Sequence, residues 1–403
     1  MGKNLIIAQS GGPTSVINAS LAGAIRAAAQ SSEIGTIYGS LHGLEGIIKD
    51  QIIDAGKVFA AEEDFERLIR TPSTALGTCR FKLSKEVDVN YETIAKKLRD
   101  LDIGYFLYIG GNDSMDTVDK LSKYFEESGM KISCIGIPKT IDNDLVVTDH
   151  TPGYGSAARY VAHSLREIEC DARVYDRHSV TIVEIMGRNA GWLTAASALA
   201  RGKHSHAPHL IYLPEIPFDR DKFIEDIKEL SQKEKAIIVA VSEGVKFASG
   251  EYVAAAPTTD YDSFGHAALS GAGRYLENIV SREFGFKTRS IEFSLLQRSA
   301  AHLASETDLR EALTCGEQAV AYALAGMNRV MVTMIRTSND PYTIEYQPSD
   351  VSRIANHEKP IPREWITEEG TDLTDAFIEY AAPLMGGKDI LPEFFLFDKK
   401  DMI

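Results

Sequence analysis

Residues 132–144 read ISCIGIPKTIDND, an apolar run that ends in a polar turn. A short run rich in β-branched residues favours a buried strand, and Asp-Asn-Asp is typical of a turn. A helical pattern follows over residues 154–169. A strand, a polar turn and a helix in this order are typical of a βαβ unit. The stretch therefore predicts a parallel sheet with polar side chains at the carboxyl edge of its strands.

The same alternation continues on both sides of this stretch. The other predicted strands cover residues 5–8, 105–109, 180–185, 210–213 and 237–241. The other predicted helices cover residues 16–29 and 116–127, with a last helical pattern at 373–384. Because 403 residues exceed one ordinary core, we expect an α/β protein with two Rossmann-like lobes. Each lobe should have a largely parallel sheet covered by helices on both faces, with the active site in the cleft between the lobes.

The composition is that of a folded globular protein, with 44% hydrophobic and 25% charged residues. A net charge of −15 predicts repulsion from nucleic acid and from anionic membranes, so we expect neither as a partner. No apolar run reaches membrane-spanning length, and no signal peptide is expected because the N-terminus runs directly into a strand-like segment. The four cysteines lie far apart without metal or redox spacing, which favours reduced thiols in a cytoplasmic protein.

Two glycine pairs, Ser10-Gly11-Gly12 and Gly110-Gly111, each follow a predicted strand. Glycine lets the backbone approach a phosphate closely, and the amides that follow can donate hydrogen bonds to it. One such pair is also compatible with a tight turn that binds nothing, whereas two pairs at strand ends favour a phosphate site. Neither pair belongs to a Walker A loop or a GxGxxG fingerprint.

Two acids stand close together in the turn quoted above. Asp142 and Asp144 are two residues apart just past a strand, so both can point into one cleft. One carboxylate could take a proton from an attacking hydroxyl while the other helps to hold a metal or to position the first. On their own, the two could equally be solvated turn acids. Lys139 and Thr140 favour a function, because an ammonium and a hydroxyl beside two carboxylates suit a phosphate and its Mg²⁺.

Several cationic residues are candidates for binding an anionic substrate: Arg80, Lys139, Arg188, Arg289 and Arg298. Each could instead be an ordinary surface residue. An arginine guanidinium can bind two phosphate oxygens at once, so arginines gathered at one strand edge would suit a phosphorylated substrate. Glu243 follows another predicted strand, where it could accept hydrogen bonds from sugar hydroxyls or be a plain loop acid.

Taken together and in this order, these segments resemble the phosphofructokinases, a fold family that ATP- and pyrophosphate-dependent enzymes share. The resemblance spans residues 4–330. The segments that carry it are Ser10-Gly11-Gly12, Cys79-Arg80-Phe81, Gly110-Gly111-Asn112-Asp113-Ser114, Pro138-Lys139-Thr140-Ile141-Asp142-Asn143-Asp144, Glu184-Ile185-Met186-Gly187-Arg188, Ser242-Glu243-Gly244 and Gln297-Arg298. The Thr-Ile-Asp-Asn-Asp and Met-Gly-Arg motifs are specific in combination.

The resemblance implies a role for each of these residues. The implied catalytic residues are Asp142 as general base for the C1 hydroxyl of fructose 6-phosphate, with Asp144, Thr140 and Lys139. The implied substrate-binding residues are Met186, Gly187, Arg188, Glu243, Arg289 and Arg298. The implied pyrophosphate-binding residues are Gly11, Gly12, Arg80, Gly111, Asp113 and Lys139. Mg²⁺ is the implied cofactor, with Asp113 and Asp142 as candidate ligands.

The resemblance also implies an organisation. Residues 1–145 would form an N-terminal α/β lobe with the phosphoryl-donor site, and residues 146–296 a second α/β lobe with the sugar-phosphate site. Residues 297–403 would pack back on both lobes. Members of this family usually share active sites between subunits, which implies a homodimer or homotetramer.

Two positions separate the phosphoryl donors that the family uses. ATP-dependent members generally have glycine where this chain has Asp113 and Lys139, and both replacements resemble the pyrophosphate-dependent members. A carboxylate about 4 Å from a nucleotide phosphate costs on the order of 4 kcal/mol at an effective dielectric of about 20. Lys139 adds positive charge for a compact tetra-anion. The implied reaction is reversible phosphoryl transfer in glycolysis, from pyrophosphate to fructose 6-phosphate, giving fructose 1,6-bisphosphate and phosphate.

Two residues depart from the family pattern. Asn112 replaces an acid that is commonly assigned to Mg²⁺, and an amide oxygen is a weaker ligand. Leu295 stands near the place of a histidine that is common among ATP users. Two alternatives follow: an ATP-dependent 6-phosphofructokinase, which Asp113 and Lys139 oppose, and a catalytically inactive regulatory or scaffold subunit, which only Asn112 supports.

Overall fold

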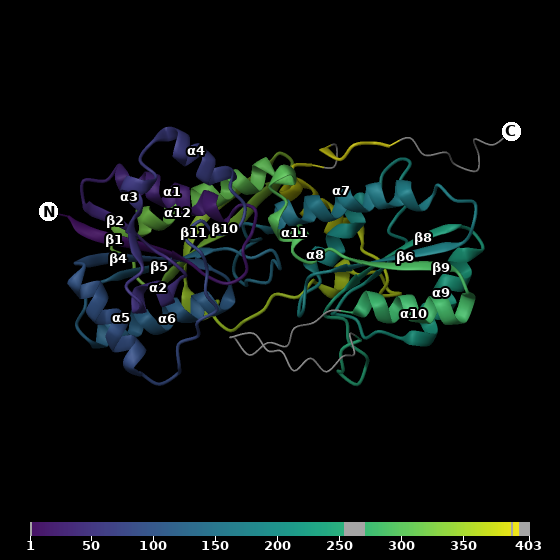
Figure 1. The fold of residues 1–403 in the computed structure, drawn as a ribbon, viewed down its shortest axis with the longest axis horizontal. Helices are drawn as coiled ribbons and strands as arrows, with labels where there is room; N and C mark the ends of the chain where they lie inside the picture. Colours follow the sequence, from purple (N-terminus) through teal and green to yellow (C-terminus); the bar gives the residue numbers. More distant parts are fainter. Residues whose placement is uncertain (1, 254–270, 388–389, 395–403) are drawn as a thin grey trace. The chain divides into compact units, whose positions relative to one another are not determined.

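The computed structural model describes residues 2–253, 271–387 and 390–394, which form two compact units (Figure 1). Of the described residues, unit 1 comprises 2–156 and 298–359, and unit 2 comprises the others. The boundaries of the two units differ from the predicted domain boundaries. Residues 146–156 group with unit 1. The predicted C-terminal segment, 297–403, is divided, with 298–359 in unit 1 and residue 297 and the described residues after 359 in unit 2. Its last residues, 395–403, lie outside the described part.

Unit 1 is built around a sheet, to which its described residues contribute seven strands. These are β1 (Lys3–Gln9), β2 (Ile34–Ser40), β3 (Ile52–Asp54), β4 (Ile103–Gly110), β5 (Ser133–Pro138), β10 (Val330–Asn339) and β11 (Tyr342–Asp350). Their order is β11-β10-β5-β4-β1-β2-β3, parallel from β10 to β2 and antiparallel at both edges. Because β5, β4 and β1 are neighbours, their carboxyl ends meet at one edge of the sheet.

Helices cover both faces of this sheet (Figure 1). One face is covered by α1 (Ile17–Ala29), α3 (Ala55–Val58), α4 (Glu62–Arg70) and α12 (Glu306–Leu324). The other is covered by α2 (Leu44–Ile48), α5 (Val89–Asp100) and α6 (Asn112–Glu127). Successive strand residues alternate between the two cores: Ile7 and Leu107 face α1, whereas Ile6 and Phe106 face α6. Because both faces of the sheet are buried, its strands appear in the sequence as continuous apolar runs.

The helix predicted at residues 116–127 begins four residues earlier, at Asn112. Asp113 lies in its first turn, where a carboxylate interacts favourably with the positive end of the helix dipole. The helix therefore starts directly after the Gly110-Gly111 turn. This start gives Asn112 and Asp113 fixed places at the carboxyl end of β4.

Unit 2 has a smaller sheet, to which its described residues contribute four parallel strands in the order β7-β8-β6-β9. These are β6 (Ser179–Ile185), β7 (Leu210–Tyr212), β8 (Ala236–Ser242) and β9 (Lys287–Glu292). The helices α9 (Arg220–Ser231) and α10 (Ala272–Phe284) pack on one face. Strand β9 was not predicted, because it is a sheet edge with polar side chains at several positions.

Other helices of the chain are α7 (Tyr154–Ala172), α8 (Trp192–Ala195), α11 (Leu296–Ser299) and α13 (Asp375–Ala381). The helical pattern predicted at residues 373–384 becomes α13 and a 3-10 turn over Ala382–Met385, because Pro383 cannot donate a backbone hydrogen bond to continue the α-helix. No helix among the described residues is both long enough and apolar enough to cross a membrane.

Candidate active site

The turn between β1 and α1 leaves room for two cations. Gly11 has a φ of +75°, a left-handed conformation that other residues rarely adopt. A Cβ atom at Gly11 would lie 3.2 Å from Nζ of Lys139, and one at Gly12 would lie 3.2 Å from Nη1 of Arg298. Both distances are tighter than ordinary contacts, so glycine at these positions lets an ammonium and a guanidinium approach the same turn.

Lys139 is buried at the end of β5 and connects the three central strand ends. Its backbone N donates to the carbonyl O of Gly110 (3.0 Å), and its Nζ donates to the carbonyl O of Gly12 (2.6 Å). Burial lowers the pKa of Lys139 to about 8, and the neighbouring arginines act in the same direction while Asp142 and Asp144 oppose it. An anion bound beside this ammonium would favour its charged form.

The segment that carries Arg80 runs along the same turn. The backbone N of Gly11 donates to the carbonyl O of Cys79 (3.2 Å), and Oγ1 of Thr78 donates to the carbonyl O of Gly11 (2.7 Å). These bonds place the exposed Arg80 near enough for its charge to lower the pKa of Lys139. Arg298, which the sequence predicted for the sugar phosphate, also lies in this group in unit 1.

The turn after Lys139 carries the two predicted catalytic acids. Oγ1 of Thr140 accepts a hydrogen bond from the backbone N of Asp142 (3.0 Å), which closes the start of the turn. Asn143 is buried with a φ of +55°, so the chain reverses between the two acids. Burial and the negative charge of Asp142 raise the pKa of Asp144 to about 7. The structure thus brings both carboxylates close to each other and to the ammonium of Lys139.

The start of α6 explains the departure at Asn112. The amide of Asn112 donates to the carbonyl O of His357, and its Oδ1 accepts from the backbone N of Asn356. The amide therefore holds a neighbouring segment of unit 1. Asp113 is paired with Lys82 (Oδ1 to Nζ, 3.3 Å), and its side chain is 27% exposed.

The described residues contain no group of three or more histidine, cysteine, aspartate or glutamate side chains that could hold a metal ion. Mg²⁺ usually keeps several waters and binds through one or two carboxylates and substrate phosphates. Asp113 and Asp142 are single carboxylates of this kind, and Asp113 already pairs with Lys82.

Unit 2 presents the Met-Gly-Arg loop at the end of β6. Gly187 has a φ of +138°, and a Cβ atom there would lie 2.7 Å from the carbonyl O of Ala190. The backbone N of Met186 donates to Oε1 of Gln297 (3.3 Å). The loop is thus a tight turn that only glycine permits, and it fixes the backbone position of Arg188.

The end of β8 supports the same loop. Oγ of Ser242 donates to the carbonyl O of Gly187, and Oε1 of Glu243 accepts from the backbone N of Gly187 (3.4 Å). A Cβ atom at Gly244 would lie 1.8 Å from the carbonyl O of Arg188. The structure therefore brings together four of the predicted substrate-binding residues: Met186, Gly187, Arg188 and Glu243.

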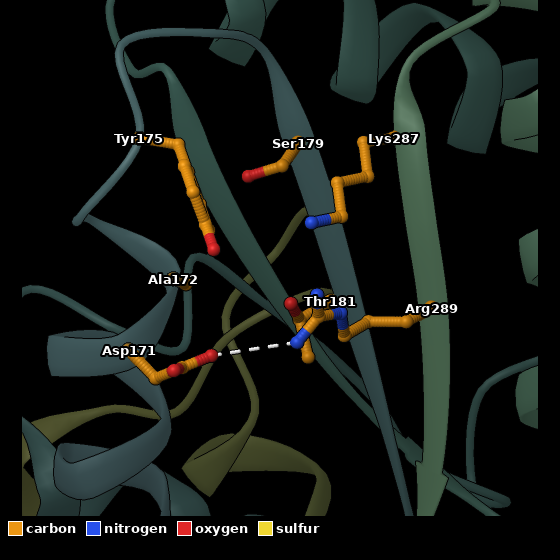
Figure 2. A pocket seen from close by; sticks show the side chains of 7 residues that line it. All are labelled: Asp171, Ala172, Tyr175, Ser179, Thr181, Lys287 and Arg289. Carbon is orange, nitrogen blue, oxygen red and sulfur yellow. Dashed lines mark hydrogen bonds and ion pairs between the residues drawn. The ribbon is translucent and has the colours of Figure 1, made fainter.

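Arg289 does not join this loop within unit 2. It lies beside Thr181 in the register of β9 and β6 (Figure 2), four residues before the end of β6, or about 13 Å along the strand. Its Nη1 lies 3.4 Å from Oδ2 of Asp171, and its side chain is 46% exposed. It lines a pocket with Tyr175 and Lys287.

Sequence reasoning missed one acid that supports the loop in unit 2. Oε1 of Glu215 accepts hydrogen bonds from the backbone N of Gly191 (2.8 Å) and of Ile361 (3.1 Å). Burial raises the pKa of Glu215. A single glutamate after a short strand belongs to no motif, so the sequence offered no signal for it.

Known proteins resemble this chain over nearly its whole length. The family model described as Phosphofructokinase matches residues 4–323. The pyrophosphate–fructose 6-phosphate 1-phosphotransferase of Xanthomonas campestris pv. campestris (strain B100) is 43% identical over 389 residues, which is 96% of this chain and 92% of the relative. The enzyme of the same name from Rhodospirillum rubrum is 41% identical over 389 residues, 95% of this chain and 94% of the relative.

A crystal structure of a pyrophosphate-dependent phosphofructokinase from Nitrosospira multiformis matches with a TM-score of 0.86 and 37% identity, covering 99% of this chain and 95% of that chain. The likeness to this solved structure covers both units and agrees with the mainly parallel α/β fold described above. The chain belongs to the phosphofructokinase family.

Proposed function

We propose that this protein is a transferase, a sugar-phosphate kinase that moves a phosphoryl group from pyrophosphate to the C1 hydroxyl of fructose 6-phosphate. The products are fructose 1,6-bisphosphate and phosphate, in a reversible step of glycolysis. The observation that carries the proposal is the buried ammonium of Lys139 beside Gly12, Asp142 and Asp144. The relatives named above as pyrophosphate-dependent enzymes support it.

We propose the following roles for the reacting groups. The carboxylate of Asp142 accepts the proton of the C1 hydroxyl, whose oxygen forms the new bond to phosphorus as the bond to the leaving phosphate breaks. Lys139 and Arg80 balance the charge of pyrophosphate, and the hydroxyl of Thr140 contacts the transferred group. In unit 2, Arg188 holds the sugar phosphate.

The charge of Asp113 is partly balanced by a neighbouring cation. Lys82 neutralises part of the charge of Asp113, so direct repulsion of a nucleotide phosphate is weaker than the sequence alone suggested. The pair of side chains also fills space beside the first turn of α6. We therefore propose that Asp113 disfavours ATP through both volume and charge.

Mg²⁺ is the proposed cofactor, with Asp113 and Asp142 as its protein ligands. When bound, it would neutralise charge on the phosphate oxygens. Oδ1 of Asn112 already accepts a hydrogen bond from the backbone N of Asn356 and is a weaker ligand than a carboxylate, so most ligands of the ion would come from pyrophosphate and water.

We further propose a homodimer or homotetramer that works in the cytoplasm. Arg289 supports an assembly, because it is exposed and lies away from the loop of Arg188 in its own unit. It is then available to the sugar phosphate bound by a second copy. The free cysteines Cys79, Cys134, Cys170 and Cys315 support a reducing compartment.

The test is a comparison of phosphoryl donors. Wild-type protein should use pyrophosphate with Mg²⁺ and show little activity with ATP. Asp113→Gly should raise the ratio of kcat/KM for ATP over that for pyrophosphate, and Lys139→Gly should lower pyrophosphate turnover because a cation is lost. The double variant should favour ATP most, although the two effects need not add.

Lys123→Gly, a change in an exposed ion pair on α6, is a control for nonspecific loss of charge. If the wild type prefers ATP, or if Asp113→Gly does not raise the ratio of kcat/KM for ATP over that for pyrophosphate, the result would favour the alternative function, an ATP-dependent 6-phosphofructokinase. If neither donor supports phosphoryl transfer, the remaining alternative is a catalytically inactive regulatory or scaffold subunit.

A further inference from the structure

Residues 150–156 lie directly behind the turn that carries the two catalytic acids. Oγ1 of Thr151 donates to the carbonyl O of Thr140 (2.8 Å), and the backbone N of Thr140 donates to the carbonyl O of Pro152 (3.2 Å). Oδ1 of Asn143 accepts from the backbone N of Thr151 (3.1 Å). Thr151 and Asn143 are fully buried. The position of the catalytic turn therefore depends on the position of this second segment.

A carboxylate of α12 holds the far end of this segment. Oδ1 of Asp308 accepts from the backbone N of Gly153 (2.8 Å), and its Oδ2 accepts from the backbone N (2.9 Å) and Oγ (2.6 Å) of Ser156. Asp308 is 2% exposed, and burial raises its pKa to about 6. A buried carboxylate is costly unless its hydrogen bonds are satisfied, and here both oxygens are used by one short segment.

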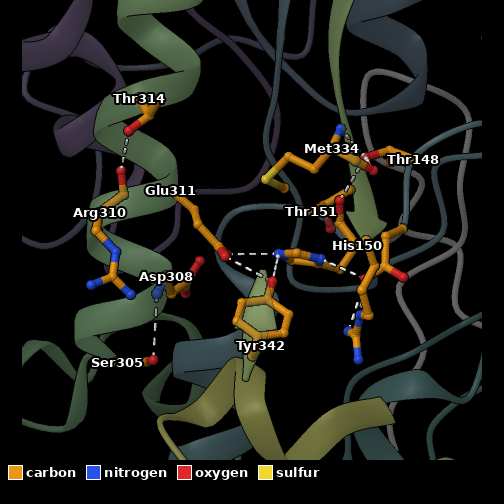
Figure 3. Close-up of polar contacts among 12 residues, drawn as sticks. Thr148, His150, Thr151, Ser305, Asp308, Arg310, Glu311, Thr314, Met334 and Tyr342 are labelled. Atoms are coloured by element: carbon orange, nitrogen blue, oxygen red, sulfur yellow. Dashed lines mark hydrogen bonds and ion pairs between the residues drawn. The ribbon is translucent and has the colours of Figure 1, made fainter. Parts of the chain in front are cut away.

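A second carboxylate of α12 holds the near end, as Figure 3 shows. Oε2 of Glu311 lies 2.7 Å from Nε2 of His150, and its Oε1 accepts from the hydroxyl of Tyr342 (2.7 Å). Nδ1 of His150 lies 2.8 Å from Oδ2 of Asp149. Asp308 and Glu311 are three residues apart, so they lie on one face of α12 and reach the segment together.

We propose that Asp308 and Glu311 of α12 are positioning residues for the phosphoryl transfer, which act by fixing residues 150–156 and, through Thr151 and Gly153, the turn that carries Asp142 and Asp144. Neither carboxylate touches a substrate in this scheme. The inference rests on the proposed function, because it takes Asp142 as the base. It explains why α12, far away in the sequence, places two buried acids behind that turn.

The central experiment uses the full-length Asp308→Asn variant. An asparagine can accept at only one of its two terminal atoms, so one of the bonds to Gly153 or Ser156 is lost while the volume stays the same. A shift of about 1 Å in a catalytic group can cost about 10²-fold in rate. We therefore expect kcat to fall by about 10-fold to 100-fold, with the KM values for fructose 6-phosphate and pyrophosphate within about twofold of wild type.

Two further variants separate positioning from general stability. Thr151→Val removes one hydrogen bond to the catalytic turn and leaves α12 intact, and should lower kcat in the same pattern by a smaller factor. Glu306→Gln removes an exposed acid from the same helix and should leave both kcat and KM unchanged. Turnover is measured well below the melting temperature of each variant, where circular dichroism shows a folded protein.

Low kcat with retained KM in Asp308→Asn and Thr151→Val supports the proposal. Wild-type kcat in either folded variant overturns it, and so does a loss of kcat that is matched by a loss of pyrophosphate affinity. If Asp308→Asn does not fold, Glu311→Gln and Thr151→Val decide in its place. Failure of wild-type protein to transfer phosphoryl groups from pyrophosphate would instead refute the proposed function, independently of these variants.

Discussion

Two strand-end turns of this molecule differ in the groups that they gather and in the contacts that hold them. In unit 1, the turn after β5 gathers the buried Lys139 and the half-buried Asp142 and Asp144 in a cluster whose charges perturb one another. In unit 2, the loop after β6 is held mainly by contacts of its backbone, and Arg188 leaves a tight glycine turn. The first arrangement is typical of groups that transfer protons and phosphoryl groups, and the second of a group that binds a substrate.

The two turns differ in the free-energy cost of the groups that they bury. Burying the ammonium of Lys139 is costly unless partners compensate, and substrate charge can supply part of that compensation. The loop after β6 is held mainly by hydrogen bonds and close contacts of its backbone. We therefore expect substitutions in the turn of unit 1 to affect turnover, and substitutions in the loop of unit 2 to affect substrate affinity.

The largest expected effect belongs to Asp142→Asn. This change keeps the volume of the side chain but removes the proposed proton acceptor, so kcat should fall by roughly 10² to 10⁴ while the fold and much of the substrate binding remain. The measurement is steady-state turnover of pyrophosphate and fructose 6-phosphate. Asp100→Asn, an exposed change in the same unit, is the matched control. Near-normal turnover in folded Asp142→Asn would remove Asp142 from the role of base.

A smaller effect is expected for Arg188→Ala. Loss of a charge-assisted hydrogen bond costs roughly 1.5–3 kcal/mol, so the KM for fructose 6-phosphate should rise about 10-fold to 100-fold while the affinity for pyrophosphate changes little. In the proposed assembly, Arg289 contacts the sugar phosphate bound by a second copy of the chain. Arg289→Ala should therefore also raise the KM for fructose 6-phosphate. The opposite pattern, in which pyrophosphate affinity falls, would show that Arg188 serves the donor.

The smallest expected effect is a change in how stability depends on pH. Burial opposes a charged imidazole, but Glu311 and Asp149 outweigh it and raise the pKa of His150 to about 9. Arg336 faces Asp149, and Tyr342 faces Glu311. Because the pKa is higher in the folded state, His150 contributes stability that is fully present below pH 6.5 and is lost as the pH rises through about 9.

His150→Gln should therefore lower the melting temperature most near pH 6, by roughly 2–8 °C, and less near pH 9.5. Thermal unfolding of wild type and variant at both pH values measures the difference. His302→Gln, an exposed histidine of the same unit, should show no such trend. A deficit in His150→Gln that is equal at both pH values would mean that His150 is not charged in the folded protein.

The sequence by itself determined the parts of the fold that depend on local pattern. Apolar runs located β1, β4, β5, β6 and β8, because a strand buried on both faces leaves a continuous apolar signal. Glycine pairs located the turns, because the left-handed φ of Gly11 and the close approach of other atoms to Gly12 and Gly110 leave little room for a Cβ atom. Resemblance to one family then assigned candidate roles, including those of Asp142 and Arg188.

Only the tertiary structure decided which distant residues support these turns. Asp308 lies more than 150 residues after the catalytic turn, and its two partners are a glycine backbone and a serine, which no motif announces. Arg298 lies beside Gly12 in unit 1, and the amide of Asn112 binds the backbone of another segment. Periodicity along a chain encodes which faces are buried, whereas the identity of a hydrogen-bond partner depends on contacts that form only when remote segments pack together.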